Sequence, residues 1–319
     1  MDVRTRVGDR DLSISNLDKV LFPATGWTKA ELINYYLQVA EVLLPHVTDR
    51  AMTRIRYPNG VADDEPQFYE KNIPSGCPAW VARQPVRTSD GVVSYVVVDD
   101  AATVVYLANL ASIEFHVPQW RISSAVPIDG MIVLPDEEGE QSNPLADRIV
   151  VDCDPGEGIT MVENAQAAMI IGAELAGDDL IGVPRTSGGK GLQVCAAIAP
   201  TPCETARRYV KDVATRLARR HPDLFVATMD KRVRTGRIFL DYNQNMAARN
   251  TVASYSVRAR DEPRVSTPLT WDEVVAVTEP DDLRFSPEQV LERIAEHGDL
   301  AADLLLPDPP PLPVLAEDG

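Results

Sequence analysis

The chain has 319 residues, which is long enough to bury a sizeable hydrophobic core in one large or two modest domains. It contains nothing that resembles a signal peptide, and no apolar stretch of about 18 residues, so the sequence argues against a secreted or membrane protein. We expect a soluble cytoplasmic protein. Its four cysteines form neither a Cys-x-x-Cys pair nor a secreted disulfide pattern, and we expect them to be reduced.

The net charge of −17 argues against a nucleic-acid partner, because Lys and Arg are needed to neutralise phosphates. The charge is unevenly distributed, however. Residues 181–260 contain 15 Lys and Arg against 5 Asp and Glu, whereas residues 261–319 contain 3 against 15. Part of the basic excess lies on a helix-like stretch at 207–220, which can be an ordinary solvated surface. The basic run at 231–234 is the better candidate for phosphate contacts, because it directly precedes a strand that ends in Asp241.

In chain order, the first 12 residues are polar and are expected to be loose. Residues 28–44 have the spacing of an amphipathic helix, with Thr28 as the N-cap and Glu31 three residues later as in a capping box. A strand is expected at 92–98, after a Ser-Asp-Gly turn. The acidic run at 136–140 is expected to form an exposed loop that separates an N-terminal region from the region that carries the motifs.

Helices and strands alternate in the second half of the chain. The predicted elements are helices at 161–177 and 203–220, with strands near 148–154, 181–185, 191–198 and 237–242. This alternation predicts a sheet with packed helices, and we expect the α+β class, with mixed or antiparallel sheets flanked by helices. Residues 1–305 are expected to form a single catalytic domain. The acidic, proline-rich segment 306–319 is expected to be a disordered tail.

The most informative motif is a pair of aspartates, Asp152 and Asp154, at the end of an apolar run. Side chains alternate across a strand, so both carboxylates point to one face, with Cα atoms roughly 6.5 Å apart. Two such charges about 4 Å apart repel by roughly 4 kcal/mol at an effective dielectric near 20, unless a cation lies between them or one is protonated. Together with Asp241, they predict a two-metal Mg²⁺ or Mn²⁺ site for phosphoryl or nucleotidyl transfer. The alternative is an ordinary strand exit, because Pro155 and Gly156 follow directly.

A glycine-rich segment at 185–192 contains Ser187, Gly188 and Lys190. Glycines let backbone N–H groups approach an anion closely, which predicts a phosphate contact. The segment is not a Walker P-loop, since the lysine is followed by Gly191 and a strand rather than by a helix. The alternative is a tight hairpin turn with a solvated lysine.

Several further segments occur together with these two motifs in a fixed order. They are Ser15–Pro23, Thr28-Lys29, Tyr35-Tyr36, Thr53–Gly60, Phe68–Lys71, Glu114–Trp120, Asp152–Gly158, Thr186–Leu192, Asp241–Asn245 and Tyr255–Arg258. The ordered set resembles the polymerase domain of bacterial ATP-dependent DNA ligase D, of the archaeo-eukaryotic primase-polymerase superfamily, which is used in non-homologous end joining. The resemblance covers roughly residues 12 to 300. Each motif alone is weakly specific, but their ordered set is highly specific.

The resemblance implies roles for individual residues. Those implied to be catalytic and to bind two Mn²⁺ or Mg²⁺ ions are Asp152, Asp154 and Asp241. Those implied to contact the nucleotide are His116, Ser187, Gly188, Lys190, Gln193, Gln244 and Arg258. Those implied to contact DNA are Asn16, Lys19 and Lys29 at a 5′-phosphate, Phe68 and Tyr69 against template bases, and Arg56, Lys231 and Arg234 as secondary contacts.

Some of these residues have simpler interpretations. His116 can be a core histidine beside Trp120, Lys19 and Lys29 can be ordinary surface lysines, and at least one of Phe68 and Tyr69 can belong to the core. One position departs from the family, which usually has histidine where Gln193 stands. Glutamine forms hydrogen bonds but carries no positive charge, so we hypothesise weakened triphosphate binding or an altered nucleotide preference.

The resulting functional hypothesis is a template-directed primase-polymerase that adds nucleotides, with a preference for ribonucleotides, at gaps or double-strand break ends. The implied partners are gapped or broken DNA with a 5′-phosphate, nucleoside triphosphates, Ku and a separate ligase, with the chain monomeric and near the nucleoid. The sequence has no Lys-x-Asp-Gly ligase motif, so we expect a stand-alone polymerase domain. Two alternatives stay open: a catalytically weakened scaffold that binds 5′-phosphorylated DNA ends, and a metal-dependent sugar-nucleotide transferase.

Overall fold

The computed structural model describes residues 3–62, 64–135, 141–279 and 281–314. The helices are α1 (Lys29–Val47), α2 (Ala101–Asn109), α3 (Met161–Gly177), α4 (Cys203–Arg220), α5 (Trp271–Val275) and α6 (Pro287–His297), with 3₁₀ turns η1 (Ile122–Ser124), η2 (Lys231–Val233), η3 (Tyr242–Asn245) and η4 (Ala302–Leu305). Within the described ranges, no helix is long and apolar enough to cross a membrane. Cys77, Cys153, Cys195 and Cys203 are all free thiols, as the sequence predicts.

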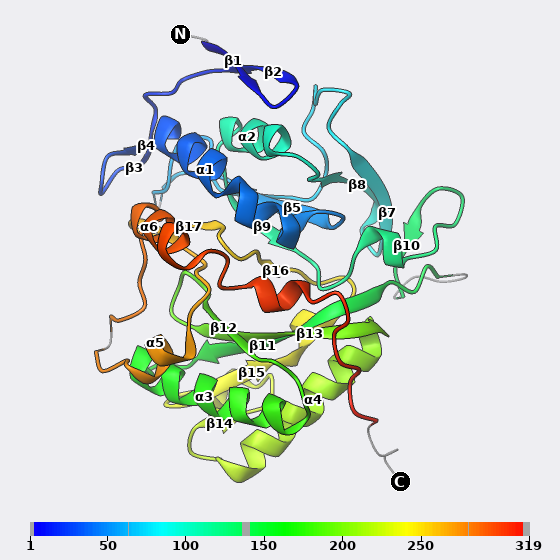
Figure 1. The fold of residues 1–319 in the computed structure, drawn as a ribbon, viewed down its shortest axis with the longest axis vertical. Coiled ribbons are helices and arrows are strands. Elements are labelled where there is room, and N and C mark those ends of the chain that lie inside the picture. The colour runs from blue at the N-terminus through cyan, green and yellow to red at the C-terminus, as the bar shows by residue number, and fades with distance from the viewer. Residues whose placement is uncertain (1–2, 63, 136–140, 280, 315–319) are drawn as a thin grey trace.

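The N-terminal half is built on a seven-stranded sheet covered by α1 and α2 (Figure 1). Its strands are β5 (Ala51–Arg56), β6 (Phe68–Glu70), β7 (Arg83–Thr88), β8 (Gly91–Val97), β9 (Ser112–Val117), β10 (Ile132–Val133) and β16 (Thr251–Val252). Their order is β10-β7-β8-β5-β9-β16, and β6 also pairs with β5. The chain therefore returns to this half through β16 after it has built the other half.

The second half is a five-stranded sheet with α3 and α4 on its outer face (Figure 1). Its strands are β11 (Leu145–Pro155), β12 (Val183–Thr186), β13 (Leu192–Pro202), β14 (Phe225–Val226) and β15 (Ile238–Asp241), in the order β12-β13-β11-β15-β14. Three two-stranded ribbons complete the fold: β1 (Val3–Val7) with β2 (Arg10–Ile14), β3 (Val20–Phe22) with β4 (Trp27–Thr28), and β17 (Val257–Ala259) with β18 (Pro263–Val265). The mixed and antiparallel sheets confirm the predicted α+β class.

Side chains of β11 alternate between two hydrophobic clusters. Ile149 and Val151 pack in the cluster with α3 and α4, whereas Val150 packs in the cluster that contains α1 and α2. Asp152 and Asp154 continue the face of Val150, because strand side chains repeat every two residues. The period of the strand therefore directs both aspartates toward the N-terminal half and away from the helices.

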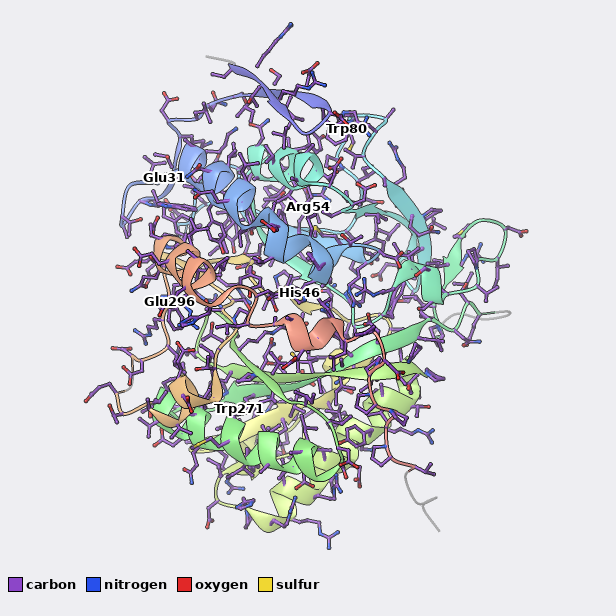
Figure 2. All side chains as sticks on the ribbon, viewed as in Figure 1. Glu31, His46, Arg54, Trp80, Trp271 and Glu296 are labelled. Carbon is purple, nitrogen blue, oxygen red and sulfur yellow. The ribbon has the colours of Figure 1, made fainter. Side chains whose placement is uncertain are left out.

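Local sequence signals place the long helices correctly. Helix α1 has Thr28 as its N-cap, with the reciprocal capping-box hydrogen bonds to Glu31, and it continues to Val47, beyond the predicted end at residue 44. Helices α3 and α4 have the predicted bounds. Trp271 of α5 packs against α3 (Figure 2): its ring lies against Gly172, and its indole N–H donates to the Gly182 carbonyl at 3.0 Å.

Two predictions about the chain ends need correction. Residues 3–14 form the β1–β2 hairpin instead of a loose segment, because Val7, Leu12 and Ile14 are buried against the body. Residues 306–314 have no helix or strand, but the described part of this predicted tail is held in place. The Pro310 carbonyl accepts a hydrogen bond from Ala199 N at 2.9 Å, and Leu312 packs against the second hydrophobic cluster.

The predicted loop at 136–140 and the final residues 315–319 lie outside the described residues. That residues 1–305 act as one catalytic domain stays a prediction.

Candidate active site

The three predicted acidic residues meet on adjacent strands. Asp152 of β11 is paired with Asp241 of β15 on one side and with Gln193 of β13 on the other. Asp154 lies two residues beyond Asp152 on the same face. The antiparallel register therefore brings together two motifs that are almost 90 residues apart in the sequence.

Two glutamine amides hold the ends of this row. Gln193 Nε2 donates to Asp152 Oδ1 at 2.9 Å, and Gln244 Nε2 donates to Asp241 Oδ2 at 2.9 Å. The backbone N–H of Asn243 donates to Asp241 Oδ1 at 3.0 Å. These donors restrict the orientation of both carboxylates.

The electrostatics of the row are unfavourable for like charges. Burial, followed by the charge of Asp154, raises the pKa of Asp152 above its ordinary value, against the hydrogen bond from Gln193. Burial and the charge of Asp241 raise the pKa of Asp154, although the Asp154 side chain is exposed to the adjoining cavity. A divalent cation would relieve the repulsion.

Carboxylate oxygens are the ligands that Mg²⁺ and Mn²⁺ prefer, so the donor set fits these ions. In the described part of the chain, no three His, Cys, Asp or Glu side chains are gathered as a formed metal site. The assignment of Asp152, Asp154 and Asp241 as metal ligands therefore stays a prediction.

The glycine-rich segment is the turn of an antiparallel β12–β13 hairpin, beside the aspartates. Gly188 has a φ of +66°, and a Cβ atom there would lie 2.4 Å from Cγ of Arg258. At Gly191, a Cβ atom would lie 2.2 Å from the Cys153 carbonyl oxygen. Glycine at these positions lets the hairpin approach both Arg258 and the strand that carries Asp152. Lys190 at its tip is exposed.

A buried acid organises two of the predicted nucleotide contacts. Glu114 is 2% exposed; it interacts with His116 Nε2 at 2.9 Å and Arg258 Nε at 3.1 Å, and accepts a hydrogen bond from Ala259 N at 3.0 Å. Arg258 Nη1 also donates to the Ser187 carbonyl at 3.0 Å, which ties it to the glycine-rich hairpin. Burial lowers the pKa of His116, although Glu114 opposes this effect. His116 is therefore held as a neutral hydrogen-bonding group at neutral pH.

These groups open into one cavity of about 760 Å³. Its lining includes the predicted residues His116, Asp152, Asp154, Ser187, Lys190, Gln193, Gln244 and Arg258. It also includes three arginines that the sequence did not single out, Arg260, Arg264 and Arg284, together with Asn250 and Thr251. The cavity lining thus combines acidic and basic side chains, which is a suitable environment for a triphosphate and divalent cations.

The three predicted 5′-phosphate residues lie together at the start of α1. Lys29 N donates to the Lys19 carbonyl, and Lys19 N donates to the Asn16 carbonyl. Asn16 is exposed, Lys19 is half-buried with Nζ on the Pro58 carbonyl, and Lys29 is 4% exposed with Nζ 2.8 Å from the Asn109 carbonyl. Lys29 is therefore a buried lysine rather than an ordinary surface one.

The predicted aromatic pair is exposed. Phe68 is 45% and Tyr69 is 54% exposed, which excludes a core role for either. The Tyr69 hydroxyl donates to Asn250 Oδ1 at 2.9 Å, so this pair adjoins the cavity through Asn250. Arg56 lies in the same region, where it pairs with Glu70 at 2.7 Å.

The basic run before β15 is only partly described. The Arg234 guanidinium lies 3.8 Å from the Phe239 ring centroid and donates to the Met229 carbonyl at 2.9 Å. The Lys231 side chain lies outside the described part of the structure. Contacts of both residues with DNA stay predictions.

Sequence reasoning missed Glu114 and Arg185 as site residues. Both are buried charged residues on strands, and a charged residue inside an apolar strand is the signal that could have found them. Apart from His116, which lies on the same strand as Glu114, their partners lie on other segments of the chain and could not be read from the sequence.

An α+β core whose inner strands β11 and β15 carry three carboxylates beside a basic, glycine-rich hairpin defines a nucleotidyltransferase of the primase-polymerase class. A family model described as LigD, primase-polymerase domain, matches residues 28–301. The chain therefore belongs to the LigD primase-polymerase domain family.

Individual relatives agree with this assignment. The multifunctional non-homologous end joining protein LigD of Mycolicibacterium smegmatis is 42% identical over 91% of the chain, which corresponds to 36% of that protein. The bifunctional LigD of Bacillus subtilis is 29% identical over 90% of the chain and 43% of that protein. A solved polymerase domain of Mycobacterium tuberculosis ligase D, in complex with DNA, has a TM-score of 0.83 and 40% identity, covering 93% of this chain and 99% of that one. The chain spans less than half the length of the two LigD proteins from Mycolicibacterium smegmatis and Bacillus subtilis.

Proposed function

We propose that this chain adds nucleotides, with a preference for ribonucleotides, to the 3′-hydroxyl of a primer strand at short gaps or broken DNA ends. The observation that carries the proposal is a cavity lined by Asp152, Asp154, Gln193, Lys190 and Arg258. Asp241 is paired with Asp152 on the adjacent strand. Non-homologous end joining is the setting that the names of the relatives suggest. The chain would then act in the cytoplasm on nucleoid DNA, with Ku and a separate ligase as partners.

Different residues of the cavity region would bind the metal ions and the triphosphate. Asp152, Asp154 and Asp241 would hold two Mn²⁺ or Mg²⁺ ions, which when bound stabilise the attacking and leaving oxygens of in-line transfer. Lys190 and Arg258 would bind the triphosphate and offset the charge that develops on the leaving pyrophosphate.

DNA would contact two regions outside the cavity. The cluster of Asn16, Lys19 and Lys29 would bind a 5′-phosphate on the downstream strand, with Arg56, Lys231 and Arg234 as secondary contacts. Phe68 and Tyr69 are exposed next to the cavity and would stack on template bases, for which stacking is worth roughly 1 to 3 kcal/mol per base.

The test is primer extension on a short-gapped duplex with a 5′-phosphorylated downstream strand. Ribonucleotides and deoxyribonucleotides are compared in Mn²⁺ and Mg²⁺, with Asp152→Ala as the control. Extension that is lost in Asp152→Ala and weakens without the 5′-phosphate supports the proposal. Tight binding that depends on the 5′-phosphate, without extension in either metal, would instead establish an end-binding scaffold.

A further inference from the structure

Arg185 is a buried arginine whose hydrogen-bond partners are all neutral. It lies on β12 and is 2% exposed. Its guanidinium donates to Gln193 Oε1 at 2.8 Å, Ser254 Oγ at 3.2 Å and Thr251 Oγ1 at 3.4 Å. Among the described carboxylates, none forms an ion pair with it. Burial of a charge without a directly paired opposite charge is costly, so its retention at this position calls for a functional explanation.

One side chain, Gln193, links Arg185 to the carboxylate of Asp152. Gln193 is 3% exposed and connects Arg185 to Asp152: its Oε1 accepts from Arg185, and its Nε2 donates to Asp152 Oδ1 at 2.9 Å. A guanidinium can only donate, so it requires the carbonyl oxygen of the amide to face it. The amide NH₂ group must then face Asp152. Arg185 therefore determines the direction of the amide and strengthens it as a donor through polarisation.

The far side of Arg185 is anchored in the other half of the protein. Thr251 lies on β16, which pairs with β9 of the N-terminal sheet. Thr251 Oγ1 also accepts a hydrogen bond from Gln119 Nε2 at 2.9 Å, and Gln119 Oε1 accepts one from Arg148 Nε at 3.0 Å. Arg148 is itself 3% exposed. A buried polar network thus runs from the N-terminal sheet to the carboxylate of Asp152.

We propose that Arg185 is a positioning residue that holds Gln193, and through Gln193 the carboxylate of Asp152, in the orientation that binds a divalent cation. The inference rests on the proposed function only in taking Asp152 as a metal ligand. It assigns the role to a residue that lies outside the cavity lining and would touch neither metal nor nucleotide. Partners that orient a metal ligand typically contribute about 10- to 100-fold to metal affinity.

The test measures Mn²⁺ binding directly, by electron paramagnetic resonance of free Mn²⁺, in the full chain without nucleotide or DNA. Arg185→Met and Gln193→Leu should each weaken binding by about tenfold, and the double variant should bind no more weakly than either single one. Gln193→His should retain binding, because a neutral imidazole can accept at one nitrogen and donate at the other. Arg185→Lys should give an intermediate affinity.

A matched control separates this effect from the general loss of a buried arginine. Arg50 is also fully buried but pairs with Asp147 at 2.6 Å, so Arg50→Met should lose stability and retain Mn²⁺ affinity. A folded Arg185→Met that binds Mn²⁺ like the wild type would overturn the proposal. If Arg185→Met does not fold, Gln193→Leu decides, and wild-type affinity in that variant overturns the proposal as well.

The outcomes remain separable from those of the proposed function. If Arg185→Met weakens Mn²⁺ binding but the wild type never extends a primer, the proposed polymerase activity is refuted and the positioning role of Arg185 stands. In an active wild type, the Mn²⁺ concentration for half-maximal extension should rise with the loss of binding, and saturating Mn²⁺ should restore the rate. Active variants without any change in Mn²⁺ affinity would refute the positioning role alone.

Discussion

Asp152 on β11 and Asp241 on β15 lie directly opposite each other in an antiparallel strand pair. Opposed like charges destabilise a sheet, so this arrangement opposes folding unless a cation or a proton is bound. The raised pKa of Asp152 and of Asp154 is the electrostatic consequence of burial and this crowding. The same crowding supplies the driving force for metal binding.

Asp154→Asn should therefore separate stability from activity. Without divalent metal at neutral pH, the variant should unfold at a higher temperature than the wild type, because one of three crowded charges is removed. Primer extension should fall by about 100-fold or more. Thermal unfolding with and without Mn²⁺ checks this, since the wild type should gain more from Mn²⁺ than the variant. A lower unfolding temperature in metal-free buffer would contradict the repulsion argument.

Glu114→Gln should raise the nucleotide KM. The carboxylate of Glu114 pairs with both His116 and Arg258, and a neutral amide cannot hold the guanidinium in the same way. Breaking a buried ion pair costs about 3 kcal/mol of stability, and we expect a KM increase of about tenfold with a smaller change in kcat. Glu163→Gln is the matched control, because glutamine also serves in the capping box of α3. Steady-state kinetics with an unchanged KM in Glu114→Gln would refute the role of Glu114.

Gly191→Ala should disrupt the contact between the glycine-rich hairpin and β11. The added Cβ atom would lie 2.2 Å from the Cys153 carbonyl oxygen, a backbone atom that cannot move without displacing the strand between Asp152 and Asp154. We expect a loss of about 3 kcal/mol in stability together with activity. Gly177→Ala, at the end of α3 with open space around its Cβ, should be neutral or slightly stabilising. Urea denaturation of both variants tests the difference.

Acid should weaken the contact between α1 and the C-terminal segment. His46 is buried where the two meet, as Figure 2 shows, and its Nε2 lies 2.8 Å from Asp299 Oδ2. Burial lowers the pKa of His46, so below its ordinary pKa near 6.5 the unfolded chain takes up a proton that the folded chain does not.

The pKa of Asp299 is also lowered: burial opposes the shift, but hydrogen bonds from His46 and Tyr255 outweigh it. This stability is present above the ordinary pKa of an aspartate and is lost as the pH falls through the lowered value. Both groups therefore make the free energy of unfolding fall on acidification, with the His46 part beginning below about pH 6.5. His46→Gln should flatten the decline between pH 7 and 5 in urea titrations, and an equally steep decline would exclude His46 as its source.

Gln193→His should lower the nucleotide KM. When protonated, the imidazole carries a positive charge near the triphosphate, which glutamine cannot. It then still donates to Asp152 but no longer accepts from Arg185, whereas the neutral imidazole does both. Steady-state kinetics of nucleotide incorporation measure this directly. An unchanged KM and rate would reject the hypothesis that glutamine weakens triphosphate binding at this position.

The sequence by itself determined the features that depend on neighbouring residues. The capping box at Thr28 and Glu31 marked the start of α1, and the 3.6-residue period gave the bounds of α3 and α4. The two-residue period of a strand placed Asp152 and Asp154 on one face. The order of short motifs indicated the family, which the comparisons confirm. These signals are local, so they can be read from the sequence without knowledge of the fold.

Only the tertiary structure decided which groups meet. Glu114 joins Arg258 because β9 and β17 pack together, and Arg185 reaches Asp152 only through Gln193 on the intervening strand. The β1–β2 hairpin is held in place because a few of its apolar side chains are buried against the rest of the protein. Its mostly polar composition gives no sign of this burial. Strand register and the packing of distant segments set these contacts. Neither leaves a periodic signal in the sequence, because the partners lie on separate segments of the chain.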